Sequence, residues 1–342
     1  MSDVPAEWAE HEAVWIAWPS DPALWGAALS DAQAEFAALA GAIADPDARG
    51  VPRGERLEIL VHPDHPEASE RAHQALSGLG ARFHPIRFGD IWLRDTGPIF
   101  VPDGGVLKAH VFRFNGWGRR YELDGDAGLS ARIADRANAQ TMIHSWVLEG
   151  GAVEFDGEDT VVTSRSCLLH PNRELGASET EVTEMLKRDL GVEHVVWVSR
   201  GLKNDHTDGH IDTLARFVAP GIMVCMEPTD ASDPNRDALL AIADELRDAH
   251  DASGRGIELR TIPSPGAVFD DDGVLLPASY ANFYIANTTV VVPTYGSVHD
   301  EDAVARLAEC FPSRRVVGCS ARAILSGGGA FHCITQQQPR LL

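Results

Sequence analysis

The chain has 342 residues, of which 44% are hydrophobic, and its formal net charge is -22. A chain of this length can bury a large core, although length alone leaves one large domain or two smaller ones open. The negative charge repels phosphate and no basic stripe offsets it, which argues against binding to nucleic acid or to an anionic membrane surface. A cationic substrate would instead be attracted.

Three features of the sequence indicate the cellular compartment of the protein: its apolar runs, its first residues and its cysteines. The longest apolar runs, such as 289–293, are far shorter than the roughly 20 residues that span a bilayer. The first residues show neither the basic nor the apolar stretch of a signal peptide, so we expect a cytoplasmic protein. Five cysteines are few, odd in number and widely scattered, which argues against a disulfide scaffold and leaves a thiol free for chemistry.

Several segments show the apolar spacing of amphipathic helices. In chain order, these helices are expected to begin at Ser30, Glu67, Ser178, Asp233 and about Asp300. Ser30 with Gln33, and Ser178 with Glu181, are candidate capping boxes. The second helix is expected to end at Leu79 and the third to stop at Gly191, and Pro234 at the start of the fourth suits a first turn.

Short runs rich in β-branched and aromatic residues alternate with these helices. The expected strands are 57–61, 106–114, 195–199, 211–218, 222–226 and 289–293. Alternation of the two kinds of element predicts an α/β protein. The segment 45–54 is rich in Pro and Gly, but its length suits a loop rather than a boundary, so we expect a single catalytic domain over residues 1–342.

Glycine-rich or polar turns lead directly into apolar runs at several places. They are 94–97 before 98–101, 149–151 before 152–155, 208–210 before 211–218, and 327–329 before 330–335. Each turn brings acidic, imidazole or thiol groups, and glycine lets the backbone approach a ligand closely. We therefore expect the turns to converge on one pocket. Their spacing resembles a degenerate repeat, although the period is uneven.

The segment 326–339, SGGGAFHCITQQQP, places Cys333 after three glycines and before a polar run. Cysteine is the side chain best able to act as a nucleophile near neutral pH, provided that its thiolate is stabilised. Cys333 is therefore the candidate nucleophile. The remaining cysteines lack such a context and are expected to be inert core residues: Cys167, Cys225, Cys310 and Cys319.

The segment 204–212, NDHTDGHID, concentrates imidazoles and carboxylates. On an extended strand, His210 and Asp212 would point to the same face, where they could flank a bound substrate. Two other interpretations stay open: a metal site built from His206, His210 and Asp212, and a solvated polar loop. Gly209 and the β-branched Ile211 argue against a helix here.

Two further segments bring carboxylates beside glycines, DIWLRDTGP at 90–98 and LEGGA at 148–152. Taken singly, Asp95 has the features of a turn residue and Glu149 those of a surface residue. Together with a thiol and an imidazole, the two acids are candidates for one shared active site.

At this point the sequence resembles the agmatine deiminases and related peptidylarginine deiminase-like enzymes of the guanidine-modifying pentein superfamily. The resemblance covers almost the whole chain. It lies in PAEWAEHEAVWIAW at 5–18, DIWLRDTGP, FNGWG at 114–118, LEGGA, PNR at 171–173, DGHID at 208–212, LPASYANFYIAN at 276–287 and GGGAFHCITQQ. It implies a five-bladed α/β propeller of ββαβ-type modules around a central active site.

The resemblance also implies roles. Cys333 matches the nucleophile, His210 the general acid and base, and Asp95 and Asp212 the carboxylates that grip the guanidinium group. The predicted substrate-binding residues are Trp92, Glu149, Trp117 and Asp208. These roles make physical sense, because a guanidinium is planar and permanently charged, and carboxylates can hold its N–H groups in pairs. No metal or organic cofactor is required.

The net acidity and the motif match favour agmatine as the substrate, giving N-carbamoylputrescine and ammonia through an amidino-cysteine intermediate. Arg119, and the pair Ala330 and Phe331, depart from residues common in the family and could reshape the distal pocket. The alternatives are a deiminase acting on arginine or peptidyl-arginine, a metal-dependent amidohydrolase, and a non-enzymatic scaffold. A homodimer is the common default for such an enzyme.

Overall fold

Repeated hairpin-plus-helix units make up residues 4–341, which the computed structural model describes. In one unit, β4 (Ile99–Asp103) pairs antiparallel with β5 (Val106–Arg113), and helix α6 (Leu129–Arg136) leads to β6 (Gln140–Val147), which lies parallel to β5. The helix is needed because parallel neighbours cannot be joined by a tight turn.

Within residues 4–341, five sheets of three or four strands follow this pattern, with the orders β18-β1-β2-β3, β4-β5-β6, β7-β8-β9, β10-β11-β12 and β15-β16-β17. The other strands are β1 (His11–Ala17), β2 (Arg56–Val61), β3 (Arg82–Pro85), β7 (Val153–Phe155), β8 (Thr160–Ser164), β9 (His194–Val198), β10 (Ala215–Ala219), β11 (Ile222–Glu227), β12 (Glu258–Pro263), β13 (Val268–Phe269), β14 (Leu275–Leu276), β15 (Tyr284–Ile285), β16 (Thr289–Thr294), β17 (Arg315–Ser320) and β18 (Thr335–Pro339). The predicted α/β class with repeated ββαβ-type modules is confirmed.

Helices join the parallel strands of each sheet. They are α2 (Leu29–Ala44), α6, α8 (Glu179–Leu190), α9 (Arg236–Arg247) and α10 (Asp300–Cys310). Helix α3 (Pro66–Ala75) joins the parallel strands β2 and β3 in the same way. The shorter helices are α1 (Pro22–Trp25), α4 (Leu93–Thr96), α5 (Gly116–Arg119), α7 (Arg165–Leu168) and α11 (Arg322–Leu325), with 3-10 turns η1 (Gly26–Ala28), η2 (Gly150–Ala152), η3 (Pro171–Arg173) and η4 (Ile211–Thr213). No helix within residues 4–341 is long and apolar enough to cross a membrane.

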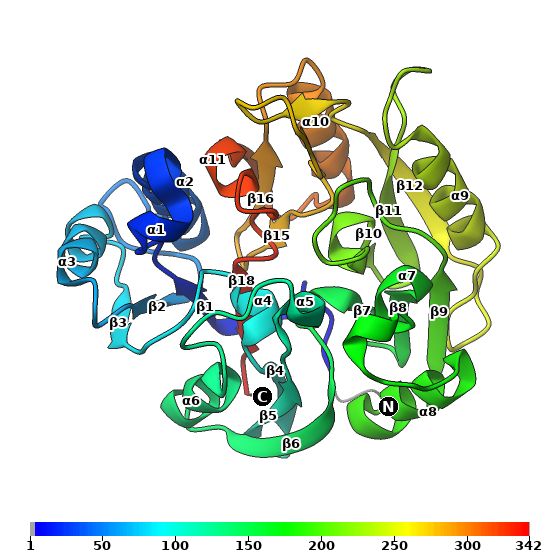
Figure 1. The fold of residues 1–342 in the computed structure, drawn as a ribbon, viewed down its shortest axis with the longest axis horizontal. Coiled ribbons are helices and arrows are strands. Elements are labelled where there is room, and N and C mark those ends of the chain that lie inside the picture. The colour runs from blue at the N-terminus through cyan, green and yellow to red at the C-terminus, as the bar shows by residue number, and fades with distance from the viewer. Residues whose placement is uncertain (1–3, 342) are drawn as a thin grey trace.

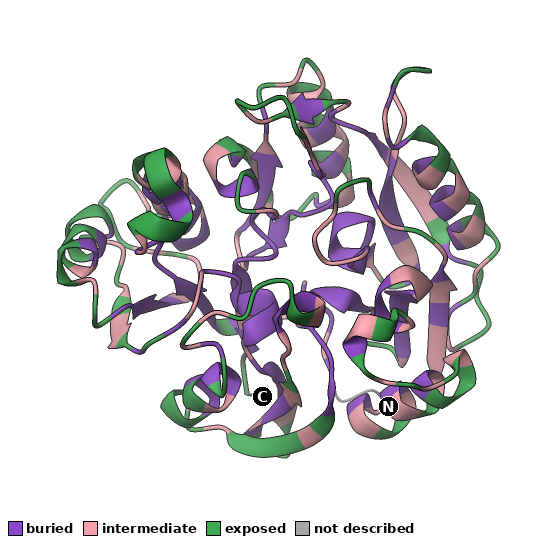
Figure 2. Cartoon of the chain, in the orientation of Figure 1, coloured by how far each residue is buried: buried purple, intermediate pink, exposed green. Residues whose placement is uncertain are grey.

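The last strand closes the first sheet. β18 pairs antiparallel with β1, so that Trp15 lies opposite Gln336, and β1 pairs parallel with β2 on its other side. Figure 1 shows the sheets arranged around a common centre, with the larger helices towards the periphery. Burial follows the same plan, because the strands and turns near the centre are buried while the outer helix faces are exposed (Figure 2).

Two helix starts differ from the sequence predictions. The capping box at Ser30 and Gln33 is wrong: η1 runs directly into α2, whose N-cap is Ala28, and Gln33 donates instead to the Pro19 carbonyl at 2.7 Å. Helix α9 begins at Arg236 rather than at Asp233, because the Asp233 carboxylate accepts from the Asn235 N–H and forms a turn before the helix.

The remaining helix predictions fit more closely. Ser178 and Glu181 form the predicted capping box of α8, and Gly191 ends that helix with a φ of 68°. Helix α10 begins at Asp300, as expected. Helix α3 ends at Ala75, short of Leu79, because the chain turns there through Gly78 with a φ of 85°.

Two predicted strands begin late. Residues 211–213 form the 3-10 turn η4, and β10 starts only at Ala215. Residues 330–334 form turns, and β18 starts only at Thr335. In both places the chain leaves the strand geometry where it carries His210, Asp212 and Cys333, so these side chains are placed by turns rather than by a strand alternation.

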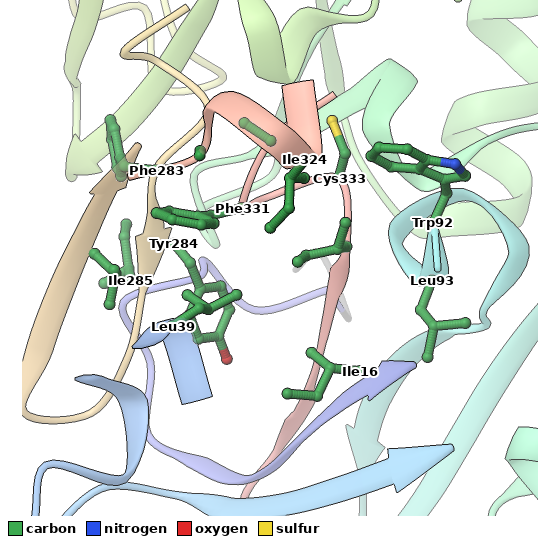
Figure 3. Close-up of a cluster of buried hydrophobic side chains, with 14 of the residues drawn as sticks. Ile16, Leu39, Trp92, Leu93, Phe283, Tyr284, Ile285, Ile324, Phe331 and Cys333 are labelled. Atoms are coloured by element: carbon green, nitrogen blue, oxygen red, sulfur yellow. The ribbon is translucent and has the colours of Figure 1, made fainter. Parts of the chain in front are cut away.

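The turn that carries Cys333 is anchored in the core. Phe331 and Ile334 are fully buried on either side of Cys333. Figure 3 shows the Phe331 ring on the side of Phe283 and Tyr284, while the sulfur of Cys333 lies beside Trp92. Burial of these large apolar side chains fixes the backbone on which the thiol sits, since each contributes about 2 to 3 kcal/mol.

Candidate active site

A pocket of about 220 Å³ opens at the centre of the fold. Of the residues predicted from the sequence, Trp92, Asp95, Trp117 and Cys333 line it. The others, Glu149, His210, Asp212 and Asp208, do not line it. The first three of these are fully buried, so they can reach a ligand only at the bottom of the site.

The Cys333 thiol lies at the bottom of the pocket with 5% of the residue exposed. Its sulfur accepts from Asn282 Nδ2 at 3.1 Å and lies 3.5 Å from Asp212 Oδ2. Burial raises the pKa of the Cys333 thiol well above its ordinary value, and the charges of Asp212 and Asp95 raise it further. The unliganded site therefore holds a neutral thiol rather than a thiolate.

The glycine run next to Cys333 makes room for an indole. A Cβ atom on Gly327 or Gly329 would lie 2.7 Å from the Trp92 ring, and one on Gly329 would also lie 3.1 Å from the Cys333 sulfur. Contacts this short are not tolerated, so glycine is required at both positions. The run therefore allows Trp92 to form a wall directly beside the thiol.

Asp95 reaches the pocket from the short helix α4. One carboxylate oxygen accepts from Trp117 Nε1 at 2.8 Å, and the other accepts from the Gly151 N–H at 2.9 Å. Burial raises the pKa of Asp95, and the nearby carboxylates of Asp212 and Glu149 add to the effect, although His210 and Trp117 oppose it. Asp95 is thus held in place but short of positive charge.

His210 lies between two carboxylates without bonding closely to either. Its Nδ1 is 3.6 Å from Asp95 Oδ1, its Nε2 is 4.0 Å from Glu149 Oε2, and neither nitrogen has a hydrogen-bond partner among residues 4–341. Burial lowers the pKa of His210, but Asp95, Cys167 and Glu149 outweigh it and raise that pKa well above its ordinary value. The ring is therefore a proton donor at neutral pH.

Gly151 marks the point where these groups converge. A Cβ atom there would lie 2.6 Å from His210 Nδ1, 2.8 Å from Asp95 Oδ1 and 3.1 Å from Asp212 Oδ2. Three functional groups from α4 and the turn around η4 therefore surround one spot. A side chain at position 151 would occupy it, which explains the need for glycine in the LEGGA segment.

Asp212 differs from Asp95 in forming a close hydrogen bond with an imidazole. Its Oδ2 accepts from His332 Nδ1 at 2.8 Å, and its Oδ1 has no partner among the described residues. Burial raises the pKa of Asp212, but the hydrogen bond and charge of His332, with His210 and Arg216, outweigh it and lower that pKa. Asp212 is therefore ionised, with one oxygen free to bind a cation.

Glu149 and Asp208 meet at a buried arginine. Arg173 Nε lies 2.9 Å from Glu149 Oε1, and Arg173 Nη1 lies 2.6 Å from Asp208 Oδ2. Asp208 also accepts from Asn172, at 2.8 Å. The structure thus places Asp208 behind the site as a partner of Arg173, so its predicted contact with substrate stays a prediction.

The metal hypothesis built on His206, His210 and Asp212 is not reproduced by the geometry. Within residues 4–341, the one group of three potential ligands consists of Glu149, Cys167 and His210, whose ligand atoms lie within 4.8 Å of one another. His206 instead lies at the pocket rim, 3.1 Å from the Tyr121 hydroxyl. Arg173, paired with Glu149, opposes the binding of a cation at this group.

Sequence reasoning missed several residues of the site. Asn282, Arg173 and His332 contact Cys333, Glu149 and Asp212 respectively. Each stands in a segment singled out above, yet their partners lie far away in the chain. Cys167, which we expected to be inert, lies beside His210. A polar residue within an otherwise apolar segment, such as Asn282, was the one local signal available.

Comparison with known proteins shows which family the chain resembles over its whole length. Residues 3–339 match the family model of the Porphyromonas-type peptidyl-arginine deiminases. An agmatine deiminase of Pseudomonas putida is 36% identical over 98% of this chain and 95% of its own, and one of Stutzerimonas stutzeri is 35% identical over the same shares. A structure described as agmatine deiminase of Enterococcus faecalis catalyzing its reaction superposes with a TM-score of 0.92 at 28% identity, over 100% of this chain and 96% of that one.

Proposed function

The chain belongs to the Porphyromonas-type peptidyl-arginine deiminase family, and from this premise we propose that it hydrolyses agmatine to N-carbamoylputrescine and ammonia. It is a hydrolase acting on the C–N bond of a linear amidine. The observation that carries the proposal is the convergence of a thiol, an imidazole and two carboxylates at the bottom of one pocket. That set of groups matches the needs of guanidinium hydrolysis.

Binding begins with the two carboxylates. The free oxygen of Asp212 and the carboxylate of Asp95 receive the N–H groups of the planar guanidinium and fix its plane relative to Cys333. Because those same two negative charges raise the pKa of the Cys333 thiol, arrival of a cation between them lowers that pKa. The substrate thus promotes ionisation of the sulfur that attacks it.

The chemistry then proceeds in two halves. The Cys333 thiolate attacks the central carbon, and the resulting tetrahedral adduct takes a proton from His210, so that ammonia leaves and an amidino-cysteine remains. His210, now neutral, removes a proton from water as the water attacks the amidino carbon. Collapse of this second adduct breaks the C–S bond and releases the ureido product, and the hydroxyl proton of the adduct passes to sulfur. His210 keeps the proton that it took from water, and the proton that Cys333 released before its attack leaves through the pocket to bulk water, so both groups return to their starting states.

The outer part of the pocket suits a substrate whose far end is a cation. Trp92, Trp117 and Tyr121 provide aromatic walls, and no lysine or arginine lies among the lining residues of the described chain. Asp90 also lines the pocket, where it accepts from Trp25 Nε1 at 3.0 Å and from Trp92 Nε1 at 2.8 Å.

The side-chain donors to Asp90 are two neutral indole N–H groups, and burial raises its pKa to about 6. An ammonium group would relieve this uncompensated carboxylate, whereas the carboxylate of free arginine would be repelled by it. These observations support agmatine over arginine.

The experiment is ammonia release from agmatine, arginine and a blocked arginine peptide, by the wild type and by Cys333→Ala, in the presence of EDTA. We expect release from agmatine that survives the chelator and is lost in the variant. Release from another guanidine alone would keep the mechanism and overturn the substrate. Activity retained by Cys333→Ala would overturn the nucleophile, and loss with EDTA would favour a metal-dependent amidohydrolase.

The substitution Asp90→Asn tests whether Asp90 recognises an ammonium group at the far end of the substrate. We expect kcat/KM for agmatine to fall roughly 10- to 100-fold, as for a lost charge-assisted contact, while kcat/KM for butylguanidine, which lacks the ammonium, stays within about twofold. Equal losses for the two compounds would show that Asp90 does not recognise the far end of the substrate.

Location and assembly complete the proposal. We also propose that the enzyme is cytoplasmic and that it forms a homodimer, the commonest assembly of soluble enzymes. Cell fractionation and light scattering of the purified protein test these two points separately.

A further inference from the structure

A buried histidine connects the active site to the N-terminal segment. His332 Nδ1 lies 2.8 Å from Asp212 Oδ2, and His332 Nε2 lies 2.7 Å from Glu7 Oε2. All three residues are buried, with exposures of 1% for His332, 0% for Asp212 and 5% for Glu7. The imidazole therefore bridges two carboxylates that are 205 positions apart in the sequence, out of contact with water.

The geometry fixes how this ring hydrogen-bonds. Burial raises the pKa of Glu7, but Arg216, His332 and Arg94 outweigh it and lower that pKa well below its ordinary value, and the pKa of Asp212 is lowered as well. Both carboxylates are ionised and can only accept hydrogen bonds. Both ring nitrogens of His332 must then donate, which makes the ring a positively charged imidazolium.

Charge balance supports the same conclusion. Glu7 also pairs with Arg94 at 3.1 Å and with Arg216 at 3.0 Å, and Arg216 pairs with Glu154 at 2.8 Å. This buried network, defined by Glu7, Asp212, Glu154, Arg94, Arg216 and His332, contains three carboxylates and two guanidinium groups. A charged His332 brings the count to three against three, and buried charges are stable only when they are compensated in this way.

We propose that His332 is a positioning residue for the reaction: as an imidazolium anchored by Glu7, it holds the Asp212 carboxylate beside Cys333 and leaves Oδ1 without a partner among the described residues, available to the substrate. The hydrogen bond fixes the orientation of a carboxylate whose bonded oxygen Oδ2 already lies next to the Cys333 sulfur. The positive charge keeps Asp212 from taking the proton of the neighbouring Cys333 thiol, 3.5 Å away. Asp212 therefore stays ionised and can bind the guanidinium group.

The inference rests on the proposed deimination for its kinetic test. We compare His332→Gln with His11→Gln, a matched change at another buried histidine. His11 is 4% exposed, and its ring hydrogen-bonds with Glu55 and Tyr284 rather than with Asp212 or Cys333. Glutamine at position 332 can still donate one hydrogen bond to Asp212, but it carries no charge and cannot bridge to Glu7.

For His332→Gln we expect kcat/KM for agmatine to fall about 100-fold at neutral pH, in keeping with the loss of a residue that orients a catalytic group. We also expect the acid limb of the pH profile of kcat/KM to move up by at least about one pH unit, because Asp212 loses a cation that lowers its pKa. His11→Gln should leave the limb in place. An unchanged limb in a folded, active His332→Gln enzyme would overturn the proposal.

A second measurement does not depend on activity. The ¹⁵N spectrum of the wild type at pH 7, with the His332 signals identified by comparison with Glu7→Gln, should show both ring nitrogens of His332 protonated. Glu7→Gln should leave one of them unprotonated. One unprotonated nitrogen in the wild type would overturn the inference. A wild type inactive on every guanidine would overturn the proposed function alone, because the spectrum still decides the state of His332.

Discussion

Asp212 is surrounded by buried polar groups on two sides, but within the described chain these groups have protein partners on only one of them. On the pocket side, Asp212 Oδ1 and both nitrogens of His210 have no hydrogen-bond partner among residues 4–341. On the inner side, the buried network around Glu7 pairs each carboxylate with a cation at 2.7 to 3.1 Å. Unpaired buried groups are costly, so their concentration on one side marks the place where a ligand supplies the missing partners.

On the pocket side, we expect the largest effect on activity from the substitution Asp95→Asn. We expect kcat/KM for agmatine to fall on the order of 1,000-fold, because one of the two charges that hold the guanidinium is lost. Thermal stability should fall only slightly, since the neutral amide removes a buried carboxylate of raised pKa but turns its NH2 group toward one of the two N–H donors, Trp117 or Gly151. Ammonia release and thermal unfolding measure the two effects. A large loss of stability would show that Asp95 is a structural residue.

On the inner side, Glu7→Ala should instead act on stability. Removing the shared carboxylate leaves buried cations unpaired, which costs about 3 to 5 kcal/mol in the free energy of unfolding. Because the pKa of Glu7 is lowered on folding, its contribution is present at neutral pH and is lost as the pH falls below the ordinary carboxyl range.

Urea unfolding at pH 7 measures the effect of this change. Glu12→Ala is the matched control, because Glu12 forms an exposed ion pair with Arg56 that should contribute less than about 1 kcal/mol. Equal effects of the two substitutions would contradict the contrast between the buried network and the surface.

The protonation state of Cys333 gives a smaller and more specific test. Because burial and the charges of Asp212 and Asp95 raise the pKa of the thiol, iodoacetamide should alkylate Cys333 slowly at pH 8 and faster above pH 9. Asp95→Asn removes one of those charges, so alkylation at pH 8 should accelerate several-fold. Mass spectrometry of the modified peptide follows the rate. Fast alkylation of the wild type at pH 7 would mean that the resting site holds a thiolate.

The smallest effect is expected far from both sides. Ser178→Ala removes the capping hydrogen bond of α8 and should cost about 1 kcal/mol of stability without altering kcat/KM. Thermal unfolding and ammonia release test this together. A loss of activity would show that the outer helices are coupled to the pocket more tightly than the contrast implies.

Local signals account for what the sequence predicted. The capping box at Ser178 and the stop at Gly191 involve residues within a few positions of one another, and both were predicted correctly. The start of α2 was not, because the 3-10 turn before it holds the chain in a helical path and makes Ser30 an interior residue.

The candidate site divides in the same way. The segments carrying Cys333, Asp95 and His210 were evident from their glycines and polar groups. The turn at His210 was predicted as a strand, because its β-branched residues fit either geometry. The bridge from Asp212 through His332 to Glu7 could not be predicted, since it depends on where distant turns meet in space.

The pairing of β18 with β1 has a consequence for biosynthesis. The ribosome synthesises β1 long before β18, so the sheet that contains both cannot be completed until β18 has left the exit tunnel. Cys333 immediately precedes β18, and it therefore reaches the carboxylates only at that moment. A chain interrupted between Asp212 and Cys333 has the acids and the imidazole but no nucleophile, and a shorter chain lacks some of these groups as well, so products of translation that stop before Cys333 are inert towards guanidines.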